Sequence, residues 1–111
     1  MQIDQNKRGA VVVVSPHGSL DINTRQVFQD ELIGLLDTGE TVLLVDLSYV
    51  DFMTSTGLSA MLFTAKRVED MAGKFAVCSI NNDIQSVFEI SGFNTILDIY
   101  PNVDEALAKL Q

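Results

Sequence analysis

The segment 41–47, TVLLVDL, is almost continuously apolar and is rich in Val and Leu. A strand with one face in water alternates apolar and polar residues, whereas this segment has no polar face until Asp46. A run of this kind is typical of a strand that is covered on both sides, usually in a parallel sheet. The segment therefore predicts a central strand that is covered on both faces.

Other segments alternate regularly between strand and helix patterns. We expect strands at 2–5, 10–15, 41–47, 75–80 and 96–100, and helices that begin near Arg25, at 54–57, after 81–83 and after Asn102. Asn side chains at 81, 82 and 102 are good helix caps, and Gly92 is a good helix end. The order β-β-α-β-α-β-α-β-α predicts one α/β domain over residues 1–111, with a mixed and largely parallel sheet.

Three adjacent hydroxyl residues, Thr54, Ser55 and Thr56, stand where the central strand's connection meets the next helix, just before Gly57. Any of the three could cap that helix by accepting a hydrogen bond from a free backbone N–H group. A phosphoryl group on Ser55 would also be favourable there, because about −1.5 to −2 of charge would meet the positive end of the helix dipole. The residues alone leave both interpretations open.

Two apolar residues before this cluster and three polar residues in an earlier loop are further candidates. Phe52 and Met53 lie in the predicted loop before Ser55, where we expect them to be exposed. Asp21, Asn23 and Thr24 could cap the helix that begins near Arg25.

The charge balance excludes some partners. Seven Lys and Arg residues against 15 Asp and Glu give a net charge of −8, which repels nucleic acid and anionic lipid. The N-terminal residues lack the apolar stretch of a secretory signal, and no apolar run approaches the ~20 residues that span a bilayer. We expect a cytoplasmic protein with no membrane insertion and no direct contact with nucleic acid.

Enzyme and metal chemistry find little support in the residues. Ser55 lacks a Gly-x-Ser-x-Gly elbow, and the single histidine, His17, reads as a loop residue. One His and one Cys form no zinc pattern, and we expect Asp46 and Asp51 to be solvated strand ends rather than magnesium ligands. Cys78 reads as a small core residue. The spacing and lysine of a P-loop are also absent, so we expect no cofactor.

Three motifs carry a resemblance to a known family. Gly18-Ser19-Leu20-Asp21, Val45-Asp46-Leu47 and above all 51–58, DFMTSTGL, resemble the successive signatures of STAS domains in bacterial anti-sigma factor antagonists. The resemblance covers nearly the whole chain. It implies a non-enzymatic module that binds an anti-sigma factor with serine kinase activity and so releases a sigma factor.

The resemblance also implies roles for individual residues. Ser55 matches the serine that the kinase phosphorylates and a serine phosphatase restores, while Asp21 helps to form the recognition surface. Many phosphorylated members have an acidic residue where this chain has Thr54, so Thr56 and Thr54 are alternative acceptors. The full predicted partner surface is Asp21, Asn23, Phe52, Met53, Thr54, Ser55, Thr56 and Gly57.

Two other functions compete with this interpretation. The first is a STAS-type module that binds a small ligand or acts as a signalling scaffold without phosphotransfer. The second is an unrelated enzyme.

Overall fold

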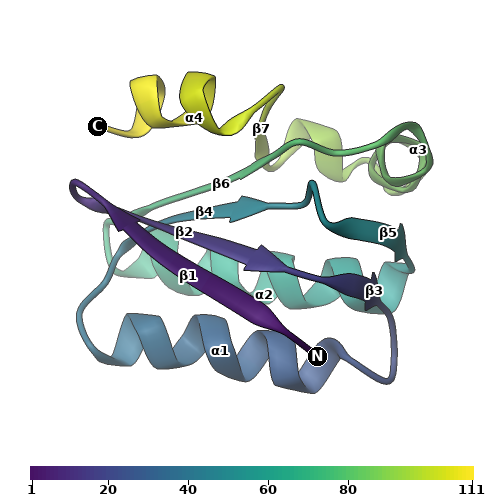
Figure 1. Ribbon diagram of the computed structural model, residues 1–111, viewed down its shortest axis with the longest axis horizontal. Coiled ribbons are helices and arrows are strands. Elements are labelled where there is room, and N and C mark those ends of the chain that lie inside the picture. Colours follow the sequence, from purple (N-terminus) through teal and green to yellow (C-terminus); the bar gives the residue numbers. More distant parts are fainter.

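A computed structural model describes residues 1–111 (Figure 1). Its main sheet has five strands in the order β1-β2-β4-β6-β7, with β1 antiparallel to β2 and all other neighbours parallel. This confirms the predicted single α/β fold with a mixed, mostly parallel sheet. The strands are β1 (Ile3–Arg8), β2 (Val11–Pro16), β3 (Gly18–Leu20), β4 (Val42–Asp46), β5 (Val50–Met53), β6 (Lys74–Cys78) and β7 (Asp98–Tyr100). The helices are α1 (Arg25–Asp37), α2 (Ser55–Asp70), α3 (Asn82–Ser91) and α4 (Val103–Leu110), with a short 3₁₀ turn η1 at Phe93–Thr95.

Both faces of the central strands are covered, as the apolar segment 41–47 predicts. On β2, Val12 and Val14 belong to a large core cluster on the side of α1 and α2, whereas Val11 and Val13 pack in a smaller cluster with α4. The two layers are visible in Figure 1, with α1 and α2 below the sheet and α4 above it. Each strand face thus has its own apolar partner, which explains why β2 and β4 carry no polar face.

The structure contains two short strands that the sequence pattern did not predict. β3 and β5 form a separate two-stranded parallel sheet in which Ser19 pairs with Phe52 and Leu20 with Met53. The segment 50–53 is therefore a strand and not part of a loop. This pair of strands lies at the end of the molecule where β2 and β4 finish (Figure 1).

Helix boundaries follow the predicted signals closely. The side chain of Asn81 accepts a hydrogen bond from the backbone N–H of Ile84 at 2.8 Å, and Asn102 accepts one from Glu105 at 2.9 Å. Gly92 ends α3 with φ of 77°, a left-handed conformation that glycine adopts without strain. The first strand is longer than expected, because β1 continues to Arg8 and the turn is confined to residues 9–10.

None of the helices combines the length and the apolar composition that a membrane-spanning helix needs.

Candidate functional site

The pairing of β3 with β5 brings two distant segments together. The strands are parallel and their last residues, Leu20 and Met53, are paired, so both strands end at the same level. The backbone N–H of Thr54 donates to the carbonyl of Leu20 at 3.0 Å. Asp21 follows β3 and Ser55 follows Thr54, so the two predicted site loops begin at the carboxyl end of this small sheet. The structure thus brings together the two segments that the sequence analysis selected separately.

The capping role belongs to Thr54. Its hydroxyl accepts a hydrogen bond from the backbone N–H of Gly57 at 3.4 Å, and its backbone is extended, as is usual for an N-cap residue. Ser55 is the first residue of α2, is exposed, and makes no side-chain hydrogen bond within the protein. Thr56 is half-buried. Of the three residues, only Ser55 is exposed and has a hydroxyl group that makes no hydrogen bond within the protein.

Gly57 holds the start of α2 against β3. A Cβ atom at this position would overlap the carbonyl oxygen of Leu20 and would lie 2.7 Å from its carbonyl carbon. Because these atoms belong to the backbone, no side-chain rotation could relieve the overlap. The absence of a side chain at Gly57 lets the first turn of α2 approach β3 closely. Because Gly57 is itself buried, it presents little surface to a partner.

The loop after β3 is fixed by local hydrogen bonds. Oδ1 of Asp21 accepts from the backbone N–H of Asn23 at 2.9 Å, while the hydroxyl of Thr24 donates to the carbonyl of Ser19 at 2.7 Å. Thr24 also accepts from the backbone N–H of Asp21 at 3.1 Å. The sequence predicted that Thr24 could cap α1, but its side chain makes no capping hydrogen bond and ties this loop to β3 instead.

Phe52 and Met53 behave differently from each other. Phe52 is 53% exposed, whereas Met53 is only 3% exposed and packs in the main core. The prediction that Met53 is an exposed partner contact is therefore wrong. The reason is that β5 is a strand, in which successive side chains point to opposite faces.

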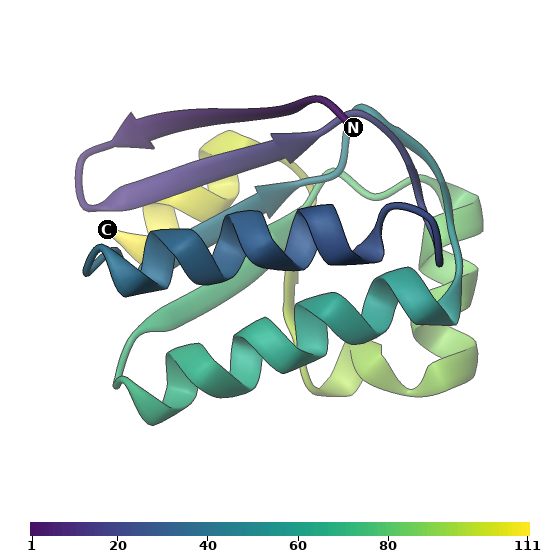
Figure 2. The ribbon, with the colours of Figure 1, turned by 90° about the horizontal axis from the view of Figure 1, so that it is seen from below.

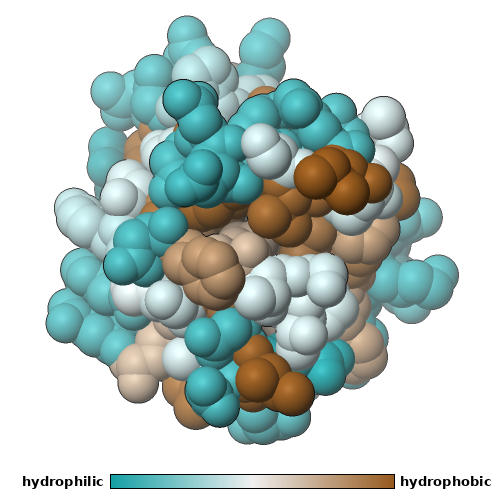
Figure 3. All heavy atoms as spheres, turned by 90° about the vertical axis from the view of Figure 1, so that its right-hand side faces the viewer, coloured by the Kyte–Doolittle hydropathy of each residue, from teal (hydrophilic) through white to brown (hydrophobic).

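Ile22 is a surface residue that the sequence analysis missed. It is 78% exposed in the loop between Asp21 and Asn23. Figure 3 looks at this end of the molecule and shows separate apolar patches among polar atoms. The polar neighbours Asp21 and Asn23 in a predicted loop were the sequence signal that Ile22 would be exposed.

Three further sequence predictions are tested by the geometry. Asp46 is only 8% exposed and its Oδ1 accepts from the backbone N–H of Ser48 at 3.1 Å, so it is not a solvated strand end. Asp51 is exposed and accepts from the hydroxyl of Ser19 at 3.3 Å. Cys78 is fully buried, and burial raises the pKa of its thiol to about 11, which confirms a core role.

His17 links three segments at the base of β3. It lies between β2 and β3, where its ring stacks on Tyr49 with centroids 4.5 Å apart. Its Nε2 lies 2.9 Å from Oδ2 of Asp4, and hydrogen bonds from Gln2 and His17 lower the pKa of that carboxyl group. No group of three or more His, Cys, Asp or Glu side chains converges to hold a metal ion.

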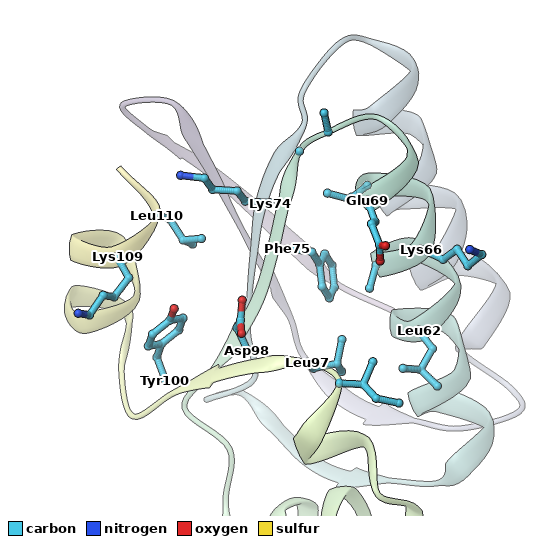
Figure 4. A pocket seen from close by; sticks show the side chains of 15 residues that line it. Leu62, Lys66, Glu69, Lys74, Phe75, Leu97, Asp98, Tyr100, Lys109 and Leu110 are labelled. Atoms are coloured by element: carbon cyan, nitrogen blue, oxygen red, sulfur yellow. The ribbon is translucent and has the colours of Figure 1, made fainter.

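One groove of about 840 Å³ lies away from these residues, between the C-terminal half of α2, β6 and α4 (Figure 4). Its walls include Leu62, Phe75 and Leu97. Three lysines and two carboxylates share its lining, namely Lys66, Lys74, Lys109, Glu69 and Asp98. This mixture gives the groove no single charge preference, and the groove shares no residue with the surface around Ser55.

Comparison with known proteins places the chain in a family. The STAS domain model matches residues 2–106, so the chain belongs to the STAS domain family. The anti-sigma F factor antagonist of Paenibacillus polymyxa is 31% identical over 114 residues, which cover 100% of this chain and 96% of that protein. Family membership confirms the resemblance inferred from the three motifs, and antagonists of this kind are regulators rather than enzymes.

Solved structures show the same fold. An anti-sigma factor antagonist from Mycobacterium paratuberculosis has a TM-score of 0.90 at 24% identity, covering 98% of this chain and 92% of that one. The Bacillus cell fate determinant SpoIIAA, solved in its phosphorylated form, has a TM-score of 0.75 at 19% identity, covering 99% of this chain and 100% of that one.

Proposed function

We propose that this protein is a cytoplasmic anti-sigma factor antagonist that is switched by phosphorylation of Ser55. In its unphosphorylated form it binds an anti-sigma factor that is also a serine kinase, and a sigma factor is thereby released. The observation that carries this proposal is the free, exposed hydroxyl of Ser55 at the start of α2, where Thr54 supplies the cap. The relatives named as anti-sigma factor antagonists support the choice of partner.

The chemistry of the switch is simple phosphoryl transfer. The Ser55 oxygen forms a bond to the γ-phosphorus of ATP as the bond from that phosphorus to the bridging oxygen of ADP breaks, and the hydroxyl proton passes to a base of the kinase. A serine phosphatase reverses the modification by hydrolysis. Because the Ser55 hydroxyl holds no hydrogen bond in the fold, the modification removes no contact that stabilises the domain.

The partner surface combines polar and apolar residues of the two loops. Asp21, Asn23 and Thr56 supply polar groups beside Ser55, and Phe52 supplies an exposed aromatic ring of the kind that often anchors an interface. Ile22 adds a second apolar contact. A phosphate in the middle of this surface would place about two negative charges where the partner excludes water, which would weaken docking.

Phosphorylation is tested by incubating the protein with its cognate kinase and ATP and mapping the product by mass spectrometry. We expect modification on Ser55 in the wild type and none on Ser55→Ala. Modification confined to Thr56 would move the switch to the neighbouring hydroxyl, and no modification on residues 54–56 would refute phosphoregulation.

Binding is tested with substitutions that separate charge from loss of the hydroxyl. Ser55→Ala should bind the anti-sigma factor as the wild type does, whereas Ser55→Asp should bind at least about tenfold more weakly because of unpaired interfacial charge. Asn6→Asp is the control, since it adds the same charge to the exposed strand β1. Equal affinities for the Ala and Asp variants would contradict the proposed surface. A metabolite bound in the groove of Figure 4 would be indifferent to all three changes and would favour the ligand-binding alternative.

A further inference from the structure

The side chain of Arg25 has no partner in the folded protein. Its Nε atom is buried and makes no hydrogen bond, and the only ion pairs are Lys7 with Glu40 and His17 with Asp4. A buried donor without an acceptor is unfavourable by roughly 1 to 3 kcal/mol and is uncommon in native proteins. An acceptor that arrives only in another state of the protein would account for it.

Arg25 stands at the N-terminus of α1. It is the first residue of α1, and its backbone N–H donates to the carbonyl of Asp21 at 2.9 Å. It precedes the buried Leu32 and Leu36 by seven and eleven residues, so it shares their inward-facing stripe. Helical side chains lean toward the helix N-terminus, and that end of α1 lies beside the N-terminus of α2 (Figure 2). Arg25 therefore stands at the end of the molecule that carries Ser55.

Arg25 is also the only Lys or Arg at this end. The chain has seven such residues. Lys7 and Arg8 lie at the turn between β1 and β2, and Lys74 is the first residue of β6. These three residues are at the end of the sheet opposite to the carboxyl ends of β4 and β6. Arg67 lies twelve residues along α2 from Ser55, or roughly 18 Å along the helix axis. Lys66 is on the same distant turn, and Lys109 is near the end of α4.

We propose that Arg25 binds the phosphate group on Ser55, an inference that rests on the proposed function. The planar guanidinium fork matches two phosphate oxygens, and backbone N–H groups in the first turn of α2 can receive another. Several carboxylates share this end of the molecule. Asp21 is half-buried and bonded to Asn23, and Asp51 is exposed and bonded to Ser19. Buried Asp46, exposed Asp4 beside His17, and Asp83 in the first turn of α3 lie at the same end. Arg25 offsets their repulsion of the phosphate. It thus holds the phosphate in place on the surface that the partner would cover.

The test uses protein with phosphoserine incorporated at position 55 during synthesis, so that no kinase is needed. The phosphorus NMR signal is followed against pH to obtain the second pKa of the phosphate, which is ordinarily about 6. A nearby guanidinium stabilises the dianion and lowers this pKa. We expect Arg25→Gln to raise it by about 1 unit relative to the otherwise identical phosphoprotein, and Arg25→Lys to raise it by less.

Arg67→Gln is the matched control and should leave the titration unchanged. Urea unfolding of each variant establishes that it is folded. If Arg25→Gln does not fold, the titration of Arg25→Lys decides the test. An Arg25→Gln titration that coincides with that of the unsubstituted phosphoprotein would overturn the proposal. If that variant instead lost affinity for the anti-sigma factor without its phosphate, Arg25 would be a contact for a partner carboxylate, and the proposal would again fail. A kinase that does not modify Ser55 would refute the proposed function but would leave the result of this titration intact.

Discussion

Gly57→Ala is expected to destabilise the protein, although alanine is the better helix former. The new Cβ would overlap the backbone of Leu20, and β3 or the first turn of α2 must move to make room. Overpacking against a rigid neighbour typically costs about 1 to 3 kcal/mol. Helix propensity returns up to about 1 kcal/mol in a helix interior and less in a first turn. The net loss should be about 1.5 kcal/mol.

Gly34→Ala provides an internal control for this prediction. Gly34 lies within α1, is exposed, and would have no atom within 4 Å of an added Cβ. The same substitution there should stabilise the protein by about 0.5 to 1 kcal/mol. Urea unfolding monitored by circular dichroism measures both variants. If both substitutions stabilised the protein, the close approach of α2 to Leu20 would not be a determinant of stability, and this account of the site would be refuted.

Further predictions concern the residues around Ser55 and the core. Thr54→Ala should lower the free energy of unfolding by about 1 kcal/mol because it removes the cap, whereas Ser55→Ala should change it by less than about 0.5 kcal/mol in the same urea titration. Phe52→Ala should weaken binding to the anti-sigma factor with little change in stability, while Met53→Ala should lower stability by about 2 to 5 kcal/mol; the reverse pattern would contradict the assigned burial. Cys78 should resist a thiol reagent at pH 8 unless the protein unfolds, and rapid labelling of the native protein would contradict its burial. Because the pKa of Cys78 is raised from 9.0 to about 11 in the folded state, the wild type should lose stability relative to Cys78→Ala between those pH values, as the unfolded thiol ionises first.

The sheet and helices were predictable because their signals are local. The continuous apolar character of 41–47 reflects cover on both faces, and the caps at Asn81 and Asn102 are formed within one helical turn. The hydroxyl cluster at 54–56 was also located correctly at a helix start. The caps join residues close together in the chain, and the apolar run shows that both faces of β4 are buried although the helices that cover it are distant in sequence.

The parts that escaped prediction depend on contacts between distant segments. β3 and β5 have three and four residues and pair across more than thirty positions, with an irregular register after Gly18. Neither strand is long enough to show a period of its own, and the burial of Met53 follows only from their pairing. The burial of Asp46 has a similar origin, since β6 covers it and Cys78 is its paired residue.

A phosphorylation switch has to meet two requirements, and at the start of α2 they fall to different hydroxyl residues. The acceptor must be accessible to a kinase, and its modification must not unfold the domain that carries it. Thr54 meets the structural requirement by capping α2, and Gly57 seats the helix against Leu20, so neither task falls to Ser55. In the proposed switch, a phosphate on Ser55 would therefore act on whatever covers that surface and leave the fold beneath it unchanged. A chain in which the acceptor serine was also the cap would couple its signal to its own stability, because every modification would then break a bond that holds the helix.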